Sequence, residues 1–81
     1  MAKPSPIHAG DPTLVALGEA VRRVRTELEM SQEALALAAE VDRSYLGGIE
    51  RGEHNLTLMN LVKIADAVGV RPSELLRRSG C

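Results

Sequence analysis

The chain has 81 residues, of which 44% are hydrophobic, with one Tyr, no Phe and no Trp. This length accommodates one small domain, and the scarcity of aromatic residues favours packed helices over a β-sandwich or barrel. Ten Lys and Arg residues against 11 Asp and Glu residues give a formal net charge of −1, which excludes a strongly basic domain.

The single cysteine, Cys81, excludes a disulfide within the chain and favours a reducing compartment. No apolar run is long enough to span a membrane, and the first residues lack the apolar core of a signal peptide. We therefore expect a cytoplasmic protein without a membrane segment.

Residues 1–12 hold three of the four prolines and are expected to form a flexible N-terminal arm, because proline fixes φ and removes a backbone donor. Lys3 is the only strong cation of this arm, so contact of the arm with DNA is the weaker alternative to an arm without function. The last residues, 79–81, are expected to fray.

The first helix is predicted over residues 13–29, where apolar residues recur at spacings of three and four and form one stripe. These residues are Leu14, Leu17, Val21, Val24 and Leu28.

Two shorter helices are predicted within residues 31–52. Ser31 and Asp42 are residue types that cap helix starts, and Gly52 suits the left-handed end of a helix. Only a few residues around Glu40 and Val41 separate the two helices, so they cross steeply, as in a helix-turn-helix. Their apolar positions are Leu35, Ala36, Ala39, Tyr45, Leu46 and Ile49.

A fourth helix is predicted from the cap Thr57 to Gly69, and a short fifth helix has Pro72 in its first turn. No stretch of strand length alternates apolar and polar residues. The fold class predicted is therefore all-α, a compact five-helix domain.

The sequence offers no constellation for catalysis or metal binding. His8 and His54 lack nearby cysteines or paired carboxylates at ligand spacing, and no nucleophile has an adjacent base. We expect no enzyme activity, no metal and no cofactor.

Gly47 and Gly48 lie inside a predicted helix, where each glycine costs on the order of 1 kcal/mol relative to Ala. Close helix packing and the approach of a large body such as a DNA groove both explain Gly47, whereas DNA is favoured for Gly48. Arg25 and Glu50 flank the stripes of the first and third helices, and a bidentate pair between them would fix the orientation of these helices.

Together, SQEALA, YLGGIERGEHN and LTLMNLVKIADAVGVRPSELL resemble the Cro/phage-repressor helix-turn-helix family, also called the xenobiotic-response-element type. The resemblance covers roughly residues 17–76 and implies a lambda-repressor-like DNA-binding domain at 13–78. Within the family, the size and the IERGE segment resemble the controller proteins of restriction–modification systems.

The resemblance implies a homodimer whose third helix enters the major groove of double-stranded DNA. Gln32 would bind phosphate at the positive end of its helix, and Arg43 would read guanine together with Ser44 and Gly48. The implied DNA-binding set is Gln32, Arg43, Ser44, Tyr45, Gly48, Arg51, Gly52, His54 and Asn55, and the implied core is Leu35, Ala36, Val41, Leu46 and Ile49.

Glu29 and Glu40 stand where the family usually has glycine. Both positions tend to require φ > 0, which costs a non-glycine residue roughly 1 kcal/mol or more.

The leading hypothesis is a sequence-specific transcriptional regulator that binds a pseudo-palindromic operator as a homodimer, controlling restriction–modification genes in its narrower form. Met59, Leu75 and Leu76 are the candidate dimer contacts. The alternative is an antitoxin-type module that covers a toxin. The chain is too short for a second domain, so no small-molecule effector is expected.

Overall fold

The computed structural model describes residues 3–81 and contains five helices in that range, with no strand. They are α1 (Pro12–Glu27), α2 (Gln32–Ala39), α3 (Arg43–Glu50), α4 (Leu58–Ala67) and α5 (Pro72–Arg78). This confirms the all-α, five-helix prediction.

The boundaries of α1 differ from the predicted range at both ends. The helix begins at Pro12 rather than Thr13, and Asp11 caps it: the Asp11 carboxylate accepts the Thr13 N–H at 2.8 Å. The helix ends two residues early because Glu29 adopts the left-handed conformation at φ 57°. Leu28 therefore leaves the apolar stripe and is half exposed.

The predicted caps of α2 and α4 are confirmed. Ser31 Oγ accepts the Ala34 N–H at 2.9 Å, and Thr57 Oγ1 accepts the Asn60 N–H at 3.1 Å. Asp42 also precedes α3 but makes no side-chain bond to the helix N–H groups, since its carboxylate accepts the Ser44 hydroxyl instead. Gly52 and Gly69 have φ of +78° and +75°, as expected of residues that follow helix ends.

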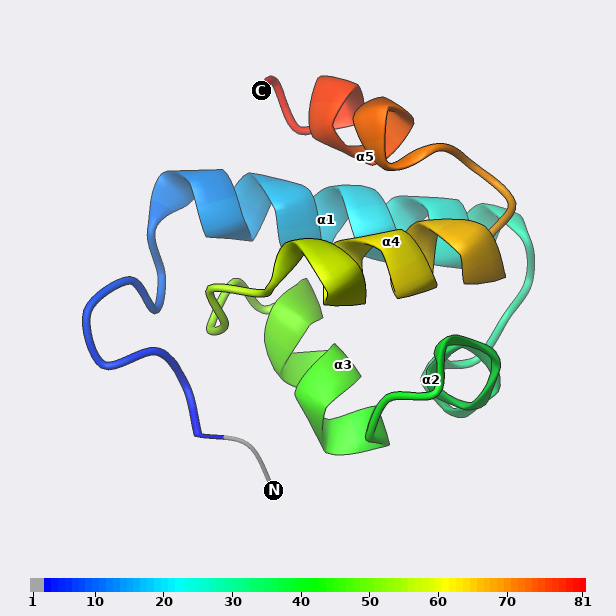
Figure 1. Cartoon of the computed structure of the whole chain (residues 1–81), viewed down its shortest axis with the longest axis horizontal. Coiled ribbons are helices and arrows are strands. Elements are labelled where there is room, and N and C mark those ends of the chain that lie inside the picture. Colours follow the sequence, from blue (N-terminus) through cyan, green and yellow to red (C-terminus); the bar gives the residue numbers. More distant parts are fainter. Residues whose placement is uncertain (1–2) are drawn as a thin grey trace.

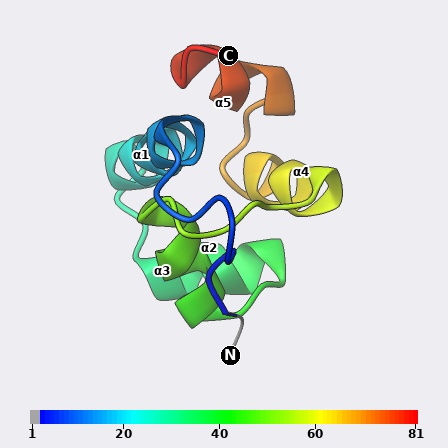
Figure 2. The same ribbon diagram turned by 90° about the vertical axis from the view of Figure 1, so that its left-hand side faces the viewer.

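The helices lie at three levels. α1 and α4 occupy the middle level, α5 lies above them, and α2 and α3 lie below (Figures 1 and 2). α1 contacts α3 and α5, α2 contacts α3 and α4, and α4 also contacts α5. The helix pair predicted at residues 31–52 therefore occupies one end of the molecule, away from α5.

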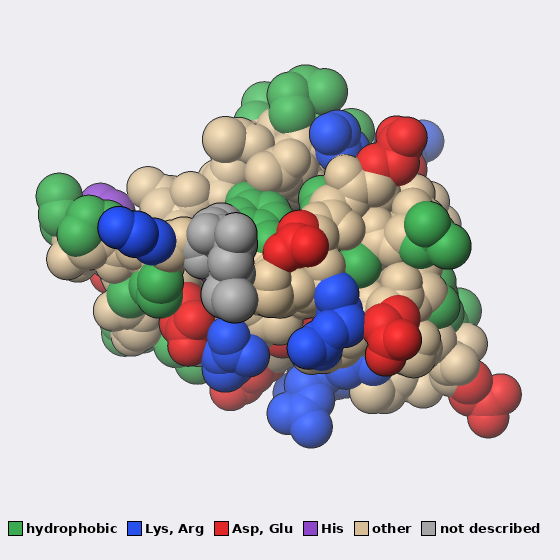
Figure 3. Space-filling model, turned by 90° about the horizontal axis from the view of Figure 1, so that it is seen from below, with side chains coloured by type: hydrophobic (Ala, Val, Ile, Leu, Met, Phe, Trp, Pro, Cys, Tyr) green, Lys and Arg blue, Asp and Glu red, His purple; other side chains and the backbone are tan. Residues whose placement is uncertain are grey.

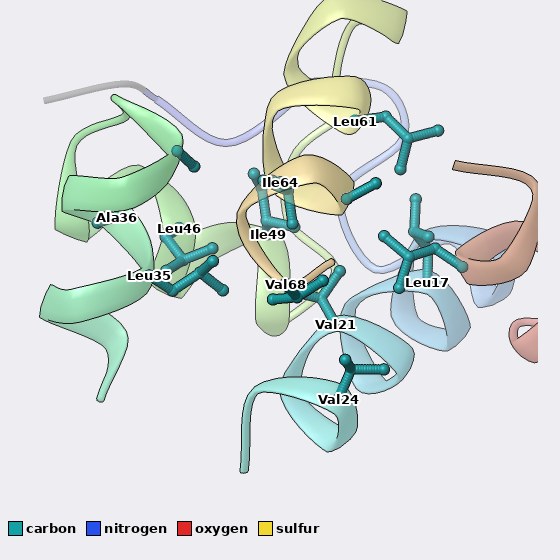
Figure 4. Close-up of a cluster of buried hydrophobic side chains, with 13 residues drawn as sticks. Leu17, Val21, Val24, Leu35, Ala36, Leu46, Ile49, Leu61, Ile64 and Val68 are labelled. Atoms are coloured by element: carbon teal, nitrogen blue, oxygen red, sulfur yellow. The ribbon is translucent and has the colours of Figure 1, made fainter. Parts of the chain in front are cut away.

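One apolar cluster joins all five helices (Figure 4). Its members from α2 and α3 include Leu35, Leu46 and Ile49, which are fully buried and each contribute roughly 1.5–3 kcal/mol by leaving water. Val41 packs against this cluster at partial burial. The remaining buried members are Leu17, Val21, Val24, Ala36, Ala39, Leu61, Ile64, Ala65, Val68 and Leu75.

Leu75 corrects one of the predicted dimer contacts. Its side chain is 0% exposed, because α5 turns this residue toward α1 and α4. It is a core residue that fastens α5 to the domain and is not available to a partner. Met59 is exposed and Leu76 is partly buried, so these two stay predictions.

The N-terminal segment is held to the loop after α3 at two points. Ser5 N–H donates to the Glu53 carbonyl at 2.7 Å, and Gly10 N–H donates to the Gly52 carbonyl at 2.8 Å. Residues 5–10 therefore follow the loop that continues from α3. The flexible arm predicted over residues 1–12 stays a prediction, and its residues 1 and 2 lie outside the described range. Within residues 3–81, no helix is long and apolar enough to cross a membrane.

Candidate DNA-binding surface

The crossing of α2 and α3 depends on Glu40. This residue caps α2 in the left-handed conformation at φ 57°, and Val41 N–H then donates to the Ala36 carbonyl at 2.9 Å. Positive φ at Glu40 and at Glu29 confirms the geometry expected of positions where glycine is usual. The turn therefore forms without glycine and carries the associated backbone cost.

The predicted Arg25–Glu50 pair is present and bidentate. Arg25 Nε donates to Glu50 Oε2 at 2.7 Å, and Arg25 Nη2 donates to Glu50 Oε1 at 3.0 Å. The Arg25 Nη1 also donates to the Met30 carbonyl at 2.8 Å. The pair is almost completely buried, so it fixes α1, α3 and the start of α2 relative to one another.

Gln32 extends this pair toward the surface. Its Nε2 donates to Glu50 Oε1 at 3.0 Å, while its Oε1 accepts from Arg43 Nη1 at 3.0 Å. Both ends of the amide are therefore occupied within the chain. The Arg43 guanidinium is joined through Gln32 to the buried pair, and the phosphate contact implied for Gln32 stays a prediction.

Arg43 begins α3 on the exposed side of the crossing, with Ser44 beside it. Both residues line a hollow of about 250 Å³ together with Pro4, Gly47, Arg51, Glu53 and His54. Seen from the α2–α3 side, Lys and Arg side chains stand among Asp and Glu side chains rather than in an uninterrupted basic patch (Figure 3).

Arg51 follows α3 and pairs with Glu53. Arg51 Nε donates to Glu53 Oε2 at 2.9 Å, and Nη2 donates to Oε1 at 3.3 Å. The hydrogen bond and the charge of Glu53 raise the pKa of Arg51, and the hydrogen bond from Arg51 lowers the pKa of Glu53. Both groups are therefore charged at neutral pH.

Gly48 and His54 correct two of the implied DNA contacts. His54 is only 6% exposed, and its ring lies against Tyr45 with a centroid separation of 4.7 Å. A Cβ atom on Gly48 would lie 2.3 Å from His54 Nε2. Gly48, which has no side chain, therefore makes room for the histidine ring, and that ring is buried rather than presented to DNA as the resemblance implied.

Tyr45 lies between the core and the surface, as expected. It packs partly against the core, and its hydroxyl accepts from Asn60 Nδ2 at 2.9 Å, so α3 and α4 are joined there. Asn60 is a contact that the sequence interpretation did not identify. Asn55 is exposed and lines a neighbouring hollow of about 200 Å³ with His8, Asp11, Thr13 and Leu14.

Gly18 is the structural residue that the sequence interpretation missed. A Cβ atom there would lie 2.2 Å from the Ile49 carbonyl oxygen and 2.7 Å from that of Glu50. α1 and α3 therefore touch through their backbones at this point. The cost of glycine inside a helix, which drew attention to Gly47 and Gly48, was the signal that could have identified it.

Two short helices that cross at Glu40, the second held to α1 by the buried Arg25–Glu50 pair, define a helix-turn-helix protein. The chain belongs to the helix-turn-helix family, which matches residues 21–75, and it is not an enzyme. Among the residues described, 3–81, no group of three or more His, Cys, Asp and Glu side chains could hold a metal ion.

The relatives narrow this class. The chain is 45% identical to the control protein C.BamHI of Bacillus amyloliquefaciens over 60 residues, 73% of this chain and 74% of the relative. It is 41% identical to the control protein C.SmaI of Serratia marcescens over 64 residues, 79% of this chain and 76% of the relative.

A solved structure of the restriction-modification controller protein C.AhdI from Aeromonas hydrophila superposes with a TM-score of 0.76 at 47% identity, covering 76% of this chain and 94% of that one. The restriction–modification resemblance is therefore confirmed, and these relatives give no support to the antitoxin alternative.

Proposed function

We propose that this chain is a sequence-specific transcriptional regulator that controls restriction–modification genes by binding a pseudo-palindromic DNA site as a homodimer in the cytoplasm. The observation that carries the proposal is the exposed start of α3, where Arg43 projects beside Ser44 on a helix fixed by the buried Arg25–Glu50 pair. The relatives are named control proteins, and the solved structure is named a restriction-modification controller protein, which supports restriction–modification genes as the regulated class.

The roles of the surface residues follow from their chemistry. The planar guanidinium of Arg43 can donate to O6 and N7 of a guanine in the major groove, and the Ser44 hydroxyl can bond a base or a phosphate. Gln32, Arg51 and Asn55 are the proposed phosphate contacts at the border of α3. Such contacts position the helix on the duplex without reading sequence.

Selection of bound duplexes from a random pool tests this function. The expected product is a two-fold symmetric sequence with half-sites about one helical turn apart, roughly 34 Å. An enriched sequence without symmetry would contradict the dimer but would still support sequence-specific DNA binding. No enrichment over the starting pool, with a folded protein, would contradict sequence-specific binding itself.

A further inference from the structure

The Arg51–Glu53 pair places a negative charge on the surface proposed to face DNA. Arg51 is largely exposed, at 61%, and Glu53 is one-third exposed, at 34%. The two hydrogen bonds between them use Nε and Nη2, the same fork that a phosphate would accept. An arginine on a DNA-facing border is therefore already held by a carboxylate of its own chain.

The backbone at Glu53 is fixed, so the loop does not carry this carboxylate away. Glu53 N–H donates to the Gly48 carbonyl at 2.9 Å, and the Glu53 carbonyl accepts the Ser5 N–H at 2.7 Å. A Cβ atom on the preceding Gly52 would lie 2.6 Å from Val15 Cγ2, so this glycine is packed closely on α1. Glu53 can therefore release Arg51 only by rotating its own side chain.

Glu53 also shares its surroundings with the proposed base-reading residues. It lines the same hollow as Arg43, Ser44 and Arg51. A phosphate that approaches Arg51 there must compete with the carboxylate. Because phosphates are the same in every sequence, this competition weakens binding to all DNA and leaves base contacts a larger share of the affinity.

We propose that Glu53 restrains phosphate binding by holding Arg51, so that tight binding depends on the base contacts made from α3. This inference rests on the proposed function, because it assigns a role within the same surface. The consequence is a protein that dissociates readily from random DNA and is retained mainly where its base contacts are satisfied.

The variant Glu53→Gln tests the proposal on a random-sequence duplex, with affinity measured by fluorescence anisotropy at several salt concentrations. The expected result is affinity roughly two- to fivefold higher than that of the unmodified chain. The slope of log affinity against log salt should become steeper by about 0.9, the value for one more phosphate contact.

Glu74→Gln is the matched control. Glu74 is also a partly exposed glutamate paired with arginines, Arg77 and Arg78, but it lies on α5, on the opposite side of the molecule from α3. The two variants change net charge equally. An equal gain in both would mean that overall charge alone is responsible and would overturn the proposal.

Arg51→Gln in the Glu53→Gln background completes the test, with each single variant also measured. The gain should disappear when Arg51 is absent, whereas a gain that persists would contradict the role of Arg51. Thermal melting by circular dichroism verifies that every variant is folded. If the unmodified chain binds no duplex at low salt, the proposed function fails; if it binds but Glu53→Gln is no tighter, only this inference fails.

Discussion

Glu40 is the residue at which the chain adopts a conformation that its side chain disfavours. It caps α2 at φ 57° and starts the turn into α3. We predict that Glu40→Gly raises the free energy of unfolding by about 1 kcal/mol, because glycine removes the left-handed penalty but adds some entropy to the unfolded chain. Urea denaturation measures this change.

Glu33→Gly provides the control for this prediction, since Glu33 is exposed in the first turn of the same helix at ordinary helical φ. There glycine should lower stability by roughly 1 kcal/mol or less. Destabilisation by both variants would show that the left-handed cost at Glu40 is compensated elsewhere.

Arg43 is the residue on which sequence recognition is proposed to depend. Arg43→Ala should weaken binding to the selected site by about 1–3 kcal/mol and leave binding to random DNA nearly unchanged. Electrophoretic mobility shift with both duplexes measures the two affinities. Arg71→Ala, at the start of α5, removes the same charge outside α3 and should weaken both only slightly. Equal losses on both duplexes for Arg43→Ala would contradict base readout.

Between elements, the contact of α1 with α3 depends on Gly18. Gly18→Ala would place its Cβ 2.2 Å from a backbone oxygen, which cannot rotate away. We predict destabilisation of about 1–3 kcal/mol, since overpacking exceeds the gain in helix propensity. The change is measurable by urea denaturation.

Gly47→Ala should have the opposite sign. Its Cβ would meet Arg51 Nη1 at 3.2 Å, the end of a flexible side chain that can move. The gain in helix propensity, up to about 1 kcal/mol, should then dominate.

If Gly18→Ala were as stable as the unmodified chain, the backbone contact between α1 and α3 would be less close than the structure gives.

The elements were predictable because their signals are local. Apolar spacing and the Ser31 and Thr57 caps predict helices without knowledge of what they pack against, and Arg25 with Glu50 could be paired from their positions beside two stripes. The burial of His54 and the close contact at Gly18 were not predictable, because both depend on which loop or helix crosses a given point. Leu75 was misassigned for the same reason: its apolar character did not indicate whether the core or a partner would cover it.

At the scale of the whole molecule, the shape is compatible with two copies on adjacent half-sites. The domain measures 31 × 28 × 20 Å, and half-sites one helical turn apart are separated by roughly 34 Å. Two copies can therefore lie next to each other with one α3 in each half-site. The net charge of −1 gives little nonspecific attraction, so the affinity of one copy should be low and pairing should matter.

The surface that joins two copies is predicted to include the start of α4. Leu58 and Met59 are adjacent there and are 71% and 62% exposed, and Leu76 is partly buried on α5. We expect size-exclusion chromatography with light scattering to give a dimer, and Met59→Glu to weaken it about tenfold or more, because a charge would replace buried apolar surface.

Leu37→Glu is the matched control, since Leu37 is 82% exposed on α2 and lies outside this surface. If the unmodified chain were a monomer at about 100 μM, the predicted dimer would be contradicted. A dimer that forms at this concentration needs a dissociation constant in the micromolar range or tighter. Dissociation by Leu37→Glu but not by Met59→Glu would instead place the interface on α2, beside the residues proposed to meet DNA.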